Sequence, residues 1–144
     1  MDANMEFILY VYQTADMGVK STTRLLNMLH NKDNKIIKII EDELKEYEKT
    51  YKESKHILEK NKIELQTKGI ITDISSYMGM KMEIIKDNSD ARIADMLIKG
   101  FTYGVLEMEK KLERYKDIDK KYLKLGETLK KFQEDNIKIL KDYV

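Results

Sequence analysis

Two aspartates in matching sequence contexts are the residues most able to do chemistry. Asp16 and Asp95 each lie in an Ala-Asp-Met triplet, and the segments 15–23 and 94–102 around them are identical at five of nine positions, at an offset of 79 residues. Both fall on apolar stripes with helical spacing, so each should be at least partly buried. A buried carboxylate is costly unless it is paired, hydrogen-bonded or bound to a cation. The pair therefore predicts either metal ligands or an internal polar layer.

The metal hypothesis adds side chains from two other segments. Glu43 would join Asp16 and Asp95 in holding one or two Fe, Mn or Zn ions. Gln133 and Asn136 are three residues apart, which places them on one face of a helix as weaker ligands. Because both are neutral amides, the set lacks charge for a pair of iron ions. The favoured prediction is accordingly that the protein holds no cofactor.

The polar-layer hypothesis uses the same acidic and amide side chains without a metal. They would hydrogen-bond to the hydroxyl groups of Tyr12 or Tyr47, with Thr23 and Thr102 as further members. A layer of this kind fixes the register of packed helices and specifies one bundle topology. In the metal alternative, Tyr47 would instead be an outer or weak ligand.

The composition excludes several other kinds of site and partner. There is no cysteine, so disulfides, thiolate zinc sites and cysteine nucleophiles are excluded. The net charge is +1 and only three arginines are present, which predicts no nucleic-acid partner. The apolar run 7–11 is too short for a membrane span or a signal segment, so we expect a cytoplasmic protein with no membrane partner. No phosphate loop or catalytic triad is present, and an enzymatic function is not favoured.

Apolar residues recur every three or four positions along most of the chain, which has no proline. This spacing predicts four long amphipathic helices, over about 3–30, 34–66, 90–116 and 118–143. Asp33 or Asn34 is expected to cap the second helix and Ser89 the third. The Met-rich segment Ile70–Lys86 is predicted to form a shorter helical piece between the second and third long helices. Residues 1–144 suit a single all-α domain.

Two hairpins with matched inward acidic residues resemble the ferritin-like superfamily. Its members are four-helix bundles of two helical hairpins with a crossover between the second and third helices. The resemblance implies that Asp16 and Asp95 correspond to the lone acidic ligands of the first and third helices in di-metal members. The Glu-x-x-His motifs of those members are not reproduced. Glu53 and His56 have the spacing but lie among lysines, which places them on the surface.

The resulting functional prediction is a non-enzymatic binding or structural protein. It would be a ferritin-like bundle without a complete di-iron site that self-associates, most simply as a dimer. A metal-binding carboxylate bundle is the alternative. The segment Ile70–Lys86 is apolar for its length, which makes it a candidate surface for a protein partner.

Overall fold

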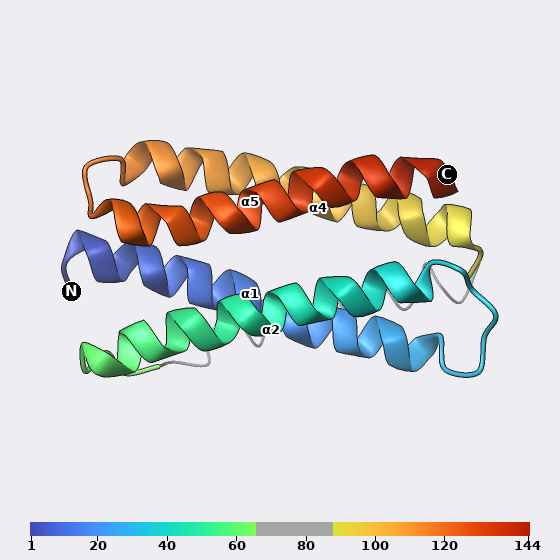
Figure 1. Cartoon of the computed structure of the whole chain (residues 1–144), viewed down its shortest axis with the longest axis horizontal. Helices are drawn as coiled ribbons and strands as arrows, with labels where there is room; N and C mark the ends of the chain where they lie inside the picture. Colours follow the sequence, from blue (N-terminus) through green and yellow to red (C-terminus); the bar gives the residue numbers. More distant parts are fainter. Residues whose placement is uncertain (66–87) are drawn as a thin grey trace.

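The computed structural model describes residues 1–65 and 88–144, and this part of the chain is helical with no strand. It contains four long α-helices and a short 3₁₀ helix (Figure 1): α1 Ala3–Met28, α2 Ile37–Lys60, α4 Asp90–Arg114, α5 Lys120–Leu140 and η1 Lys141–Tyr143. The all-α prediction and its four long helices are confirmed. The predicted helical piece over Ile70–Lys86, with its proposed partner surface, lies outside the described residues.

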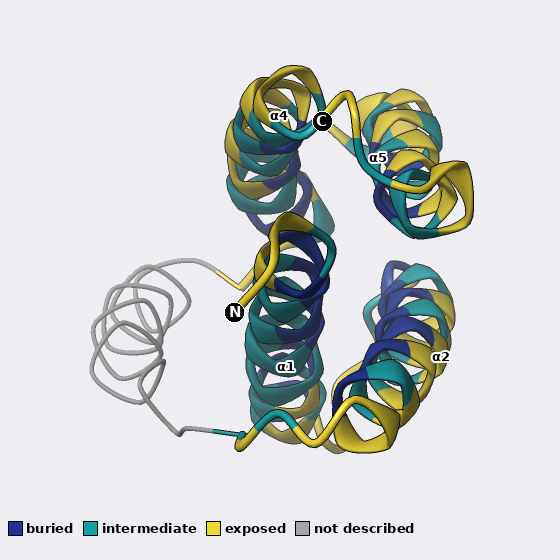
Figure 2. Cartoon of the chain, turned by 90° about the vertical axis from the view of Figure 1, so that its left-hand side faces the viewer, coloured by how far each residue is buried: buried dark blue, intermediate teal, exposed yellow. Residues whose placement is uncertain are grey.

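The long helices form two antiparallel hairpins. In each hairpin the two helices pack along their length, α1 against α2 and α4 against α5. Between the hairpins, α5 packs against α1 more extensively than against α2. In Figure 1, α2 ends and α4 begins at opposite ends of the bundle, so these two helices run in the same direction. Figure 2 shows the buried sides of all four helices turned toward a common interior.

The interior is apolar over most of its length. Its largest fully buried apolar side chains come from all four helices and from the turn before α2: Phe7, Ile8, Leu25, Leu29, Ile36, Ile40, Leu58, Ile93, Met108, Leu129 and Leu140. Burying an aliphatic or aromatic side chain of this size contributes about 1.5–3 kcal/mol. Eight of these eleven residues lie on the apolar stripes that periodicity predicts, and Phe7, Leu25 and Ile93 lie one position beside them.

One end of the bundle is joined by a cap that crosses between the hairpins. The carboxylate of Asp90, in the first turn of α4, accepts hydrogen bonds from the backbone amides of Lys35 at 3.1 Å and Ile36 at 3.4 Å. Asn34 donates to the same carboxylate at 2.9 Å. The predicted local cap of α2 by Asp33 or Asn34 is therefore wrong, because a carboxylate distant in sequence occupies that position.

Single hydrogen bonds to nearby side chains cap the start of α4 and join the hairpins at the opposite end of the bundle. Ser89 caps α4 by accepting from the Arg92 amide at 3.2 Å, as predicted. At the far end, the side chain of Asn4 accepts a hydrogen bond from the Asp119 amide at 3.2 Å. Hydrogen bonds between the hairpins thus hold both ends of the bundle.

No helix among the described residues is long and apolar enough to cross a membrane.

Gly126 of α5 and Gly100 of α4 provide opposite tests of the packing. A Cβ atom at Gly126 would lie 2.5 Å from Phe7 Cζ and 3.0 Å from Met108 Sδ, whereas none at Gly100 would meet an atom within 4 Å. We expect Gly126→Ala to lower the free energy of unfolding by about 1–3 kcal/mol through overpacking. Gly100→Ala should raise it by about 0.5–1 kcal/mol because alanine favours the helix. Urea unfolding measures both, and changes of the same sign would contradict this packing.

Candidate functional site

A small polar cluster lies in the middle of the bundle. Glu43 and Tyr47 come from α2, one turn apart, and Gln133 comes from α5. The side chains of Glu43 and Gln133 are only 1% and 3% exposed. Gln133 Nε2 donates to the Tyr47 hydroxyl at 3.5 Å, which is a long hydrogen bond. This pair forms the part of the predicted polar layer that the structure brings together.

Two oxygens of this cluster have no hydrogen-bond partner among the described residues. They are Glu43 Oε1 and Gln133 Oε1, both buried. An unpaired buried acceptor typically costs about 1–3 kcal/mol. Such a group in a native structure calls for an explanation, for example a bound molecule or water.

Glycines in the facing helices make room for the cluster. A Cβ atom at Gly18 of α1 would collide with the Tyr47 ring, and one at Gly104 of α4 would lie 2.7 Å from Gln133 Nε2. In each hairpin the glycine precedes the side chain that it admits by 29 residues. Gly18 was not singled out by the sequence patterns. Its place on the inner stripe, three residues after Ala15, is the signal that could have identified it.

A groove of about 720 Å³ runs between α1 and α4 with this cluster at its base. Its lining is mostly apolar or small: Tyr10, Gln13, Thr14, Met17, Gly18, Ser21, Thr22, Leu25, Glu43, Tyr47, Met96, Leu97, Gly100, Phe101, Tyr103, Gly104, Glu107 and Gln133. Small-molecule sites usually have about 300–1,000 Å³, apolar walls and a few polar groups. The groove matches that description in both size and chemistry.

The two predicted aspartates do not join this cluster. Asp16 is 25% exposed and pairs with Lys20 at 2.9 Å, while Asp95 is 38% exposed and pairs with Arg92 at 3.2 Å and Lys99 at 3.0 Å. Each carboxylate is therefore satisfied by a cation on its own helix. Both are partly buried, as predicted.

Their sequence match also does not place them at equivalent points of the two hairpins. Asp16 lies in the middle of α1, which begins at Ala3, whereas Asp95 lies little more than one turn after the start of α4 at Asp90. The contacts of Gly18 with Tyr47 and of Gly104 with Gln133 relate the two hairpins better. Gly104 follows Gly18 by 86 residues, and Gln133 follows Tyr47 by the same number. The repeat predicted at an offset of 79 residues is thus wrong by two helical turns.

The candidate metal ligands are not assembled into one site. In the ranges 1–65 and 88–144, no group of three or more His, Asp or Glu side chains could hold a metal ion. Asn136 is buried, but its Nδ2 donates within its own helix to the Phe132 carbonyl at 2.8 Å. Glu43 and Gln133 remain together with one carboxylate between them, which does not fit Fe, Mn or Zn.

Three of the predicted hydroxyl members also lie outside the cluster. Thr23 and Thr102 are exposed, and Thr102 Oγ1 donates to the Ile98 carbonyl of its own helix at 2.7 Å. The predicted burial of both threonines is wrong, because in α1 the inward position belongs to the neighbouring Thr22. Tyr12 is buried but stacks on Tyr51 with ring centroids 5.1 Å apart.

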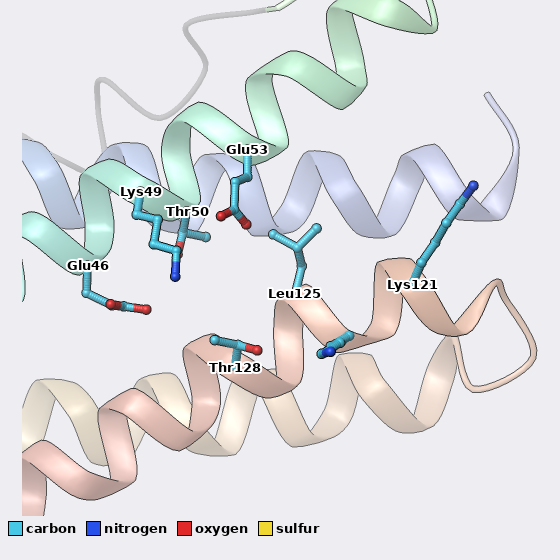
Figure 3. Close-up of a pocket in the computed structure, with 8 residues that line it drawn as sticks. Glu46, Lys49, Thr50, Glu53, Lys121, Leu125 and Thr128 are labelled. Atoms are coloured by element: carbon cyan, nitrogen blue, oxygen red, sulfur yellow. The ribbon is translucent and has the colours of Figure 1, made fainter.

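A second cleft, on the side of α2 and α5, has a different character (Figure 3). It measures about 300 Å³, and its lining mixes charges of both signs: Glu46, Lys49, Glu53, Lys121 and Lys124, with Thr50, Leu125 and Thr128. Glu53 and His56 are both exposed, which confirms their predicted surface position. Mixed, solvated charges of this kind favour neither an anion nor a cation.

Burial dominates the electrostatics of the central cluster. It raises the pKa of Glu43 to about 8. Burial likewise raises the pKa of Tyr47 above its ordinary value, so this hydroxyl stays protonated at neutral pH. The Glu43 carboxyl is thus largely neutral at pH 7 unless a cation approaches it.

The raised pKa makes the stability of the protein dependent on pH. Between about pH 4.3, where an unfolded glutamate ionises, and about pH 8, the folded chain binds more protons than the unfolded chain. The free energy of unfolding should therefore fall as pH rises, by on the order of 5 kcal/mol across this range. Glu43→Gln should remove this fall and be more stable than the parent protein near pH 8.

Urea unfolding at a series of pH values measures this difference. Glu41→Gln, an exposed substitution in the same helix, is the matched control and should leave the pH profile unchanged. Parallel profiles for Glu43→Gln and the parent protein would show that the Glu43 carboxyl is hydrated in the folded state.

Comparison of the chain with known protein families, with curated proteins and with solved structures finds no match. The geometry of the central cluster and its groove is therefore what supports a function.

Proposed function

We propose that this chain is a non-enzymatic binding protein whose binding site is the groove between α1 and α4. The observation that carries the proposal is the pair of unpartnered, buried oxygens of Glu43 and Gln133 at the base of a groove of about 720 Å³. A bound molecule with a hydrogen-bond donor would satisfy both acceptors and cover the apolar walls.

The groove favours binding over catalysis. Its described lining contains no histidine, lysine or arginine, so no hydroxyl group there has a histidine or lysine to activate it as a nucleophile. The other carboxyl group of the lining, Glu107, lies at the rim and pairs with Lys110. Holding a ligand needs only the walls and the two acceptors.

A ferritin-like arrangement is part of this proposal. It is supported by the two hairpins of similar length, by the parallel course of α2 and α4, and by the equal spacing of the two glycine pairs. Bundles with one long crossover have this order of helix directions. On this view the interior that holds metals in di-metal relatives holds an organic ligand here. We retain the cytoplasm as the proposed location.

A neutral apolar dye tests the groove directly. Nile red should bind at one molecule per chain, with higher and blue-shifted fluorescence, because the walls exclude water. Gly100→Leu should weaken binding about tenfold, since the new side chain enters a groove wall without meeting the core. Thr102→Leu places the same side chain on the exposed face of α4, outside the groove, and should bind the dye normally. Equal binding by both variants would place the dye elsewhere.

Self-association is the second part of the proposal. Tyr103 and Leu106 are exposed, at 67% and 51%, and lie one turn apart on α4. Neighbouring exposed apolar side chains favour contact with a second copy of the chain. We expect a dimer in light scattering, and Leu106→Glu should weaken it by at least about tenfold.

Ile139→Glu is the matched control for this substitution. Ile139 of α5 is 48% exposed, so the substitution Ile139→Glu introduces the same charge as Leu106→Glu at a similarly exposed apolar position. It should leave the dimer intact. A dimer that survives Leu106→Glu would place the interface elsewhere, and a monomeric parent protein would remove self-association from the proposal.

A further inference from the structure

The only side chains of the groove's described lining that ionise near neutral pH are acidic. Glu43 at the base and Glu107 at the rim are its carboxyl groups, and no lysine, arginine or histidine lines it. Glu107 faces outward enough to pair with Lys110 at 3.3 Å, whereas Glu43 has no ion-pair partner among the described residues. An anionic ligand would find no cation along the described lining, whereas a cationic ligand would favour ionisation of the Glu43 carboxyl and be attracted to it.

Aromatic rings reinforce this preference. Tyr10, Phe101 and Tyr103 line the groove on its two sides, from α1 and α4. The face of an aromatic ring attracts an organic cation. Tyr10 already makes one such contact outside the groove lining, because the Lys111 ammonium lies 5.1 Å from the centroid of its ring.

The hydrogen-bonding capacity at the base is also one-sided. Glu43 Oε1 and Gln133 Oε1 are both acceptors without a donor, while the donor Nε2 of Gln133 is already directed to Tyr47. These two oxygens therefore lack an N–H or O–H partner. The hydrogen bond from Gln133 to Tyr47 is long, at 3.5 Å, so little hydrogen-bond energy is lost if a ligand weakens it.

We propose that the groove binds a primary organic ammonium ion with an apolar body. The ammonium head donates to Glu43 Oε1 and Gln133 Oε1, and the body lies against Met96, Leu97 and Phe101. A primary ammonium has three donors on a compact centre, which suits two acceptors at a narrow base. An ammonium ion next to Glu43 also favours its carboxylate form and offsets the effect of burial. This ligand class rests on the groove being the binding site.

Three ligands of equal chain length separate the contribution of the head from that of the body. Calorimetric titration at about pH 8 with 1-octylamine, 1-octanol and octanoate compares a cation, a neutral molecule and an anion. The amine should bind at one molecule per chain, about tenfold more tightly than the alcohol, and octanoate should bind most weakly.

Substitutions of Glu43 and Gln133, at the bottom of the groove, then test which atoms produce the preference for the amine over the alcohol. Glu43→Gln should bring the amine to within about twofold of the alcohol, while leaving alcohol binding unchanged. Gln133→Met keeps the shape of the side chain but removes its acceptor, and should weaken amine binding several-fold. Glu41→Gln, at an exposed position of α2 outside the groove lining, is the matched control and should change amine binding little.

The outcomes distinguish this ligand class from the proposed function. Equal binding of amine and alcohol by the parent protein would overturn the ammonium proposal, as would a preference that survives Glu43→Gln. In either case, Nile red binding that depends on Gly100 would still support the groove. If neither the dye nor any of the three octyl ligands binds, the groove is not a binding site and both proposals fail.

Discussion

Close backbone approach at three glycines is the constraint on which the packing of this bundle depends. Each glycine faces a large side chain from a neighbouring helix: Gly18 faces Tyr47, Gly104 faces Gln133 and Gly126 faces Phe7. The first two contacts lie within the two hairpins, and the third joins one hairpin to the other. A side chain at any of these glycines would separate the helices that it joins. The centre of the bundle therefore tolerates little change in volume.

The same contacts explain why polar groups are buried at the centre. Tyr47 and Gln133 reach the interior because glycines leave space for them, and Glu43 lies one turn from Tyr47 on the same helix. The cluster then has more acceptors than donors, and burial keeps Glu43 largely neutral. All three side chains line the groove between α1 and α4. Packing, electrostatics and the proposed binding function thus share one set of residues.

The two ends of the bundle are held by different means from its centre. The Asp90 carboxylate serves the start of α2 from the opposite hairpin, and Asn4 binds the turn before α5. These hydrogen bonds orient the hairpins, while α5 packs more on α1 than on α2. The looser pairs of helices, α1 with α4 and α2 with α5, are the ones that leave clefts between them. The groove between α1 and α4 has a mostly apolar lining, whereas the cleft between α2 and α5 is lined mainly by charged side chains.

The sequence by itself determined the four long helices, their amphipathic stripes and the Ser89 cap, because helical periodicity and capping are local properties. It also identified Glu43, Tyr47 and Gln133 among the interior polar residues. Tertiary structure decided which of them meet. Asp16 and Asp95 share an Ala-Asp-Met context, yet each pairs with cations of its own helix, because side-chain rotation and helix register are set by packing and not by local identity. The unpartnered acceptors and the groove above them exist only once two hairpins come together.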